Sequence, residues 1–353
     1  MNIRILLLCL AIPNCMLSML KKEDLKKFVQ SYELVDKIPH EGNFVHSLLP
    51  IPGKNQLIAT IDKDLISFDC ETHTPTPIPT KICVTDLTFN PDKNIFYGNG
   101  GWPSMSLVVG NPQDYTCEVL GRSLNLHGTL TYSSGNKQLY SGLNNRITIL
   151  NHDGSTSSWN ALNSVYDAYV KTMCCNESEN TLCISSSRGD IEKRSTSSGK
   201  FIKSINVCKD KPIERMVCDQ SSGFLFVDTG KEGIIEQYDA NLENPQEILY
   251  GGFTTRTQTL TQDTFSKLLC ITSINNDRKG LMNVHFLHHN NQTIQFKIPI
   301  TSEPQSTACD PATGTFFVGT PGEILVFQPK KSYLALLNQS AYTVFKIGKG
   351  TLR

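Results

Sequence analysis

The sequence predicts an all-β protein: one seven-bladed β-propeller with four-stranded antiparallel blades, preceded by a signal peptide and a short helix. Three observations support this fold class. A unit of 43 residues recurs along the chain, each unit contains several short apolar runs separated by polar turns, and no unit shows a helical period. We therefore expect a signal peptide at residues 1–18, a short amphipathic helix and lead-in at 19–42, and the propeller at 43–353.

The first eighteen residues have the layout of a secretory signal. Arg4 is followed by the apolar run Ile5 to Ile12, and Pro13 to Ser18 form a polar break. The run is much shorter than the roughly 20 residues that a membrane-spanning helix needs. This predicts an exported protein, secreted or, in a bacterium, periplasmic, without membrane insertion. The alternative is a buried N-terminal strand or helix.

A short amphipathic helix is expected between the signal and the repeats. Leu25, Phe28 and Val29 share one helical face among Lys and Asp residues. Binding to a membrane surface is one interpretation. A solvated helix leading into the domain is favoured, because three apolar side chains bury little area.

The repeat is defined by the first residue of a polar turn. These residues are Asn90, Ser133, Asn176, Asp219, Gln262 and Asp310. Four successive intervals are 43 residues and the last is 48, and a seventh copy covers Leu48 to Thr60. Equal intervals of this kind rarely arise by chance, so the turns mark a structural repeat.

The pattern of each unit predicts one propeller blade. A turn such as Asn90 to Asn94 joins two runs rich in Val, Ile, Phe, Tyr and Thr, which is a hairpin signal. A third run follows, such as Arg146 to Leu150, and a weaker fourth run, such as Phe201 to Ile205, completes the unit. Seven units of four antiparallel strands fill residues 43 to about 350.

The residues just before each turn predict an inner strand packed on both faces. Cys175, Cys218 and Cys309 occupy the repeat position that holds Phe89 and Tyr132 in other units. We expect them to be buried thiols in separate blades, too far apart for the roughly 5.5 Å Cα separation of a disulfide. Cys174 and Cys175 should face opposite sides of their strand.

Several segments resemble seven-bladed propellers of the WD-repeat, YVTN and NHL type. Tyr238-Asp239 and Phe68-Asp69 stand where a Trp-Asp pair ends the third strand of a WD repeat, and Ser198 to Ile202 looks like the turn into its fourth strand. No unit has the full Gly-His and Trp-Asp pair. The resemblance implies an architecture and says almost nothing about function.

Charge and motif content exclude several functions. Lys plus Arg and Asp plus Glu number 33 each, so the chain lacks the excess of basic residues that is typical of a nucleic-acid binder. No nucleophile elbow, phosphate loop or zinc spacing occurs, so no metal and no cofactor is expected. The predicted inner-strand starts offer a single carboxylate, Glu214, beside Lys171, which is a poor cation cage; the full set is Thr85, Gly128, Lys171, Glu214, Thr257 and Gln305.

The sequence favours a non-catalytic, monomeric binding scaffold for another protein or peptide. The alternative is a cation-dependent lactonase or hydrolase at the central channel. Trp102, on the loop Gly98 to Met105, is the candidate binding residue, and its alternative role is to cap the core. Arg188-Gly189-Asp190 matches an adhesion tripeptide, but a turn between the second and third strands of a blade is the favoured interpretation.

Overall fold

The computed structural model describes residues 32–100, 106–120, 129–161, 168–209, 211–220, 222–249, 255–263, 268–275, 281–288 and 296–329. The predicted signal peptide and nearly all of the predicted short helix lie outside these residues. No described element is a helix long and apolar enough to cross a membrane.

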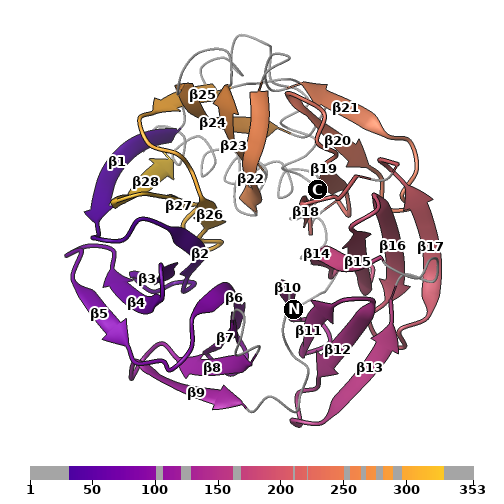
Figure 1. The fold of residues 1–353 in the computed structure, drawn as a ribbon, viewed down its shortest axis with the longest axis horizontal. Helices are drawn as coiled ribbons and strands as arrows, with labels where there is room; N and C mark the ends of the chain where they lie inside the picture. Colours follow the sequence, from indigo (N-terminus) through magenta and orange to yellow (C-terminus); the bar gives the residue numbers. More distant parts are fainter. Residues whose placement is uncertain are drawn as a thin grey trace, which may run out of the picture.

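Seven four-stranded sheets surround a central axis, and all their strand pairs are antiparallel (Figure 1). Blade 1 contains β2 (Val45–Pro50), β3 (Gln56–Ile61), β4 (Asp64–Asp69) and β5 (Pro75–Ile78). Blade 2 contains β6 (Val84–Asn90), β7 (Ile95–Gly100), β8 (Leu107–Asn111) and β9 (Thr116–Leu120). Blade 3 contains β10 (Thr129–Ser133), β11 (Gln138–Leu143), β12 (Arg146–Leu150) and β13 (Thr156–Asn160). The predicted fold class is confirmed.

The remaining blades follow the same plan. Blade 4 contains β14 (Val170–Asn176), β15 (Thr181–Ser186), β16 (Asp190–Ser195) and β17 (Phe201–Asn206). Blade 5 contains β18 (Arg215–Cys218), β19 (Leu225–Asp228), β20 (Ile234–Tyr238) and β21 (Gln246–Leu249). Blade 6 contains β22 (Thr255–Asp263), β23 (Leu268–Asn275), β24 (Leu281–His288) and β25 (Phe296–Ile300). Blade 7 contains β26 (Ser306–Cys309), β27 (Phe316–Thr320), β28 (Glu323–Pro329) and, from the other end of the chain, β1 (Tyr32–Pro39).

Blade 7 differs from the prediction in the origin of its outer strand. Residues 32–39 were expected in the lead-in, but they form β1 and pair with β28 from Tyr32↔Pro329 to Pro39↔Glu323. The ring is thereby closed by strands from both ends of the propeller. An outer strand is hard to recognise because most of its side chains face solvent: in β1 only Tyr32 and Ile38 are buried.

The core consists of seven apolar clusters among the described residues, one at each interface between adjacent blades. Both faces of the inner strands contribute. In blade 4, Cys175 packs toward blade 3 with Tyr140, whereas Cys183 packs toward blade 5 with Met216. Blades therefore pack face to face around the ring, as a sheet that is buried on both faces requires.

The 43-residue period has a physical cause in the turn after each inner strand. The side chain of the first turn residue is buried in the six aligned units, and in five of them it also caps the turn; the exception is Gln262, whose amide has no hydrogen-bond partner among the described residues. Asn90 Oδ1 accepts hydrogen bonds from the N–H groups of Asp92 and Lys93, and Asp310 Oδ1 accepts one from that of Ala312. Ser133, Asn176 and Asp219 make comparable contacts.

The cysteine predictions are confirmed except for one residue. Cys175 and Cys218 are buried, but Cys309 is only partly so. Cys174 and Cys175 belong to clusters on opposite faces of blade 4. The ten cysteines of the described residues are all free thiols in the structure.

Candidate functional site

The disc has two unlike faces, which we name from the inner strands. These strands begin on the entry face, where the blade-to-blade connections and the turns between second and third strands also lie. They end on the turn face, with the turns between first and second and between third and fourth strands. On the entry face the segments between strands differ in length, from the turn at 144–145 within blade 3 to the connection at 207–214 between blades 4 and 5.

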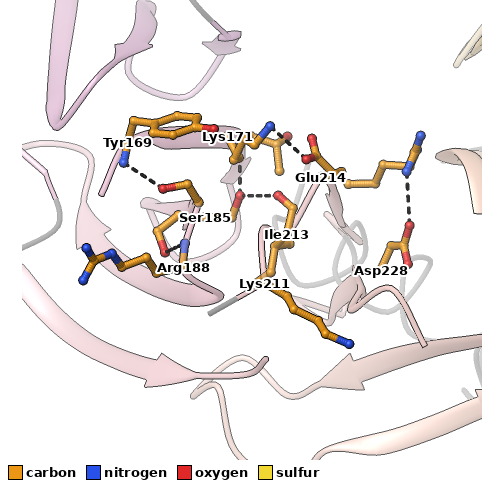
Figure 2. A network of polar contacts seen from close by, with 12 residues as sticks. Tyr169, Lys171, Ser185, Arg188, Lys211, Ile213, Glu214 and Asp228 are labelled. Carbon is orange, nitrogen blue, oxygen red and sulfur yellow. Dashed lines mark hydrogen bonds and ion pairs between the residues drawn. The ribbon is translucent and has the colours of Figure 1, made fainter. Parts of the chain in front are cut away.

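The inner-strand starts of blades 4 and 5 form a network of polar contacts on the entry face (Figure 2). Lys171 Nζ lies 2.8 Å from Glu214 Oε1 and joins the two blades. Both residues were named from the sequence as inner-strand starts. Their pairing across the interface depends on how neighbouring blades are placed, which spacing alone does not reveal.

Tyr169 lies directly before β14 and presents its ring at this face. Its side chain remains 47% exposed. Its N–H donates to Ser187 Oγ at 3.2 Å, its carbonyl accepts from Ser187 N–H at 2.9 Å, and Lys171 Nζ lies 5.5 Å from the ring centroid. The backbone is thus held while the ring is available for contact. Sequence reasoning missed this residue, although an aromatic side chain directly before an inner strand was a visible signal.

Two hydrogen bonds of Ser185, one buried and one partly buried, support the network. Ser185 Oγ donates to the carbonyl of Ile213 at 3.0 Å and accepts from the N–H of Thr172 at 3.1 Å. The β15 strand is therefore tied both to its own inner strand and to the connection into blade 5. Lys171 and Glu214 flank these ties in sequence.

A second ion pair extends the network of polar contacts toward blade 6. Arg215 Nη1 lies 3.3 Å from Asp228 Oδ2, and Arg215 Nε donates to the carbonyl of Gln258. Burial raises the pKa of the Asp228 carboxyl, against the opposing effects of the Gly230 N–H and the Arg215 guanidinium. The Arg215 side chain thus links blades 5 and 6.

The Arg188-Gly189-Asp190 tripeptide forms the predicted turn between the second and third strands of blade 4. Gly189 has φ +84°, and a Cβ there would lie 1.7 Å from the carbonyl oxygen of Cys208. The Asp190 carboxylate accepts hydrogen bonds from Asn206 Nδ2 at 2.8 Å and Ser186 Oγ at 3.3 Å. Its side chain is held within the turn.

Of the other predicted channel positions, Thr257 contacts Asp228 of the network, whereas Thr85 and Gln305 make separate contacts. Thr85 Oγ1 donates to the carbonyl of Asn99, and Gln305 Oε1 accepts from Val45 N–H while its amide donates to the carbonyl of Asn43. Gly128 lies outside the described residues. Within the described ranges, no three His, Cys, Asp or Glu side chains lie close enough together to hold a metal ion.

Trp102, the binding residue named from the sequence, also lies outside the described residues. Its loop joins the end of β7 to the start of β8. Its role stays a prediction.

A cleft of about 600 Å³ opens on the turn face between blades 7 and 1. Two of the charged side chains that line the cleft already have partners. Lys54 Nζ donates to Asn94 Oδ1 at 3.1 Å, and Asp36 Oδ2 lies 2.7 Å from His73 Nε2. Burial raises the pKa of the Cys70 thiol to about 12, so the thiolate is scarce. The cleft is a weaker candidate than the entry face.

Comparison with known proteins supports the architecture. No family model and no curated protein sequence matches this chain. Among solved structures 1758 chains match, including Raptor from Chaetomium thermophilum, with a TM-score of 0.69 and 10% identity over 88% of this chain. The match covers 30% of the Raptor chain. At this identity the similarity shows a shared fold and not a shared activity.

Proposed function

We propose that this chain is an exported, non-catalytic scaffold that binds another protein or a peptide through the entry face of blades 4 and 5. The observation that carries the proposal is the exposed Tyr169 ring beside the Lys171–Glu214 pair. Aromatic side chains held by a rigid frame are common anchors of protein interfaces. The propeller supplies such a frame, because its strands hold the ring together and its connections are left to vary.

Charge at this site favours an acidic partner. Lys209 and Lys211 are exposed on the connection from blade 4 to blade 5, and Figure 2 shows Lys211 close to Ile213 of the network. Among the described residues nearby, the carboxylates of Glu214, Asp228 and Asp190 are engaged by Lys171, Arg215 and Asn206 respectively. Asp210, between the two lysines, lies outside the described residues. An acidic segment reaching this face would meet lysine ammonium groups and an aromatic ring.

Two further parts of the proposal rest on sequence. Residues 1–18 support export, and N-terminal sequencing of the extracytoplasmic protein should find a start shortly after residue 15; recovery only as full-length cytosolic protein would contradict export. Trp102 is proposed as a second anchor; the described ends of its loop, Gly100 and Ser106, lie at the entry face and support this proposal.

The binding surface is tested with matched substitutions on the two faces. Tyr169→Ala and Lys211→Glu change the entry face, while Tyr115→Ala and Lys137→Glu change exposed residues of the turn face. Proteins crosslinked to the wild-type chain in its native environment are identified, and the affinity of a purified partner is then measured for each variant.

Under the proposal, the entry-face variants weaken binding at least tenfold, and the turn-face variants bind like wild type. All four should melt near the wild-type temperature. Equal binding by all variants, or loss confined to the turn-face pair, would contradict the proposed surface. Turnover of the bound partner by the wild-type chain would contradict the non-catalytic assignment.

A further inference from the structure

Two cysteines face each other across neighbouring strands of blade 4. In the β14–β15 pairing, Cys174 is the direct partner of Cys183. Both side chains belong to the cluster between blades 4 and 5, while the adjacent Cys175 and Leu182 belong to the cluster on the opposite side. The two thiols therefore leave the sheet on the same face.

This arrangement meets the backbone requirement of a disulfide. Directly opposed residues of an antiparallel pair have Cα atoms about 4.5–5.5 Å apart, within the range of about 4.4–6.8 Å found for disulfides. The side chains are also in contact, since a hydrogen bond with the Cys183 thiol, followed by burial, raises the pKa of Cys174. Backbone placement and side-chain contact thus agree.

We propose that Cys174 and Cys183 form an intramolecular disulfide when the chain folds in the presence of a disulfide oxidant, whether a small molecule or a protein. One cysteine thiolate attacks the oxidant and displaces its first sulfur as a thiolate. The second cysteine thiolate attacks this mixed disulfide and displaces the other sulfur. The two cysteines are oxidised, the oxidant is reduced to two thiols, and the two cysteine protons end on those thiols.

The bond should form early, before blade 5 packs against blade 4. In the folded chain Cys183 is only 4% exposed, so an oxidant cannot reach the pair without opening the interface. The hairpin itself is local: residues 177–180 connect β14 to β15. The pair can therefore meet while its face is still accessible.

The positions of the neighbouring cysteines favour the Cys174–Cys183 disulfide over other pairings. Cys175 points to the other side of the same strand, and Cys218 lies on β18 of the neighbouring blade. Cys218 approaches the pair only after the two blades have docked. The bond would fix β14 to β15, and β14 carries Lys171 of the entry face.

The test is cell-free synthesis of the full chain in a redox buffer of oxidised and reduced glutathione, with a parallel synthesis in dithiothreitol. Free thiols are alkylated, the chain is digested, and tandem mass spectrometry separates Cys174 from its neighbour Cys175. Thermal melting of both samples checks that each is folded. Because the mapping uses the wild-type chain, it does not depend on the folding of a variant.

The expected result is a Cys174–Cys183 link in the glutathione sample, with Cys175 and Cys218 alkylated, and no link in dithiothreitol. Cys175→Ser should keep the link, whereas Cys174→Ser and Cys183→Ser should abolish it. Full alkylation of Cys174 and Cys183 after oxidative synthesis would overturn the proposal. A link from either residue to Cys175, Cys208 or Cys218 would overturn it as well.

Discussion

The two faces of the disc use polar side chains in different ways. On the turn face, side chains form hydrogen bonds to the backbone of the neighbouring blade. Both carboxylate oxygens of Glu177, for example, accept hydrogen bonds from donors of blade 3. On the entry face around blades 4 and 5, charged groups pair at the surface and Tyr169 remains exposed. In this part of the ring the turn face ties blade 4 to the backbone of blade 3, whereas the entry face keeps an aromatic ring exposed beside its inter-blade contacts.

The largest expected effect is on the turn face. Glu177 accepts hydrogen bonds from Ser133 Oγ and from the N–H groups of Ser134 and Gly135, at 2.9–3.0 Å. Glu177→Ala removes three charge-assisted bonds and should lower the free energy of unfolding by about 2–3 kcal/mol. Denaturant unfolding measures the change.

The matched control for that change is Glu118→Ala, at an exposed position on the outer strand of blade 2. It should alter the free energy of unfolding by about 0.5 kcal/mol or less. If Glu177→Ala is no more destabilising than this control, the turn face does not hold the ring in the way we describe.

A smaller effect is expected from Asp86, near the entry-face end of β6. Burial raises its pKa to about 6, although Leu130 N–H and Leu87 N–H donate to the carboxylate. The native state then binds the proton more tightly than the unfolded chain, whose Asp pKa is about 4. Stability should therefore fall as the pH rises from about 4 to about 6.

Comparison of wild type with Asp86→Asn isolates this contribution. Because the residue is partly exposed, we expect the wild type to lose about 1 kcal/mol more than the variant across that pH window. Asp64→Asn, at an exposed position on β4, serves as the matched control substitution. Identical profiles for wild type and Asp86→Asn would contradict the prediction.

The smallest effect is expected for the Lys171–Glu214 pair. With side chains 23% and 47% exposed, its interaction is weakened by water and salt. A double-mutant cycle with Lys171→Ala and Glu214→Ala should give a coupling of about 0.5 kcal/mol, which declines as salt is added. A coupling of several kcal/mol would mean that this pair contributes strongly to the packing of blade 4 against blade 5.

The architecture could be predicted from the sequence because the repeat comes from buried residues that act within one turn. A polar residue such as Asn90 caps its turn from within the core, so its type and spacing are restricted in each blade. The outer strand β1 escaped recognition because only Tyr32 and Ile38 among its residues are buried. A solvent-facing strand leaves little pattern to read.

The site was only partly predictable for a related reason. Lys171 and Glu214 were located through the repeat, and the turn at Gly189 was recognised from its residue types. The exposure of Tyr169 and the opposition of Cys174 and Cys183 depend on strand register and on the packing of neighbouring blades. Neither property is encoded in the local pattern of one unit.

The pairing of β1 with β28 also imposes an order on biosynthesis. In blades 1 to 6 each strand pairs with one close to it in the chain, so these sheets can assemble as the polypeptide emerges. The partner of β1 is among the last described residues, so β1 waits unpaired until β28 has been made. During that interval its backbone donors and acceptors are an open edge that another chain could occupy. Crowded synthesis should therefore favour exchange of this strand between copies.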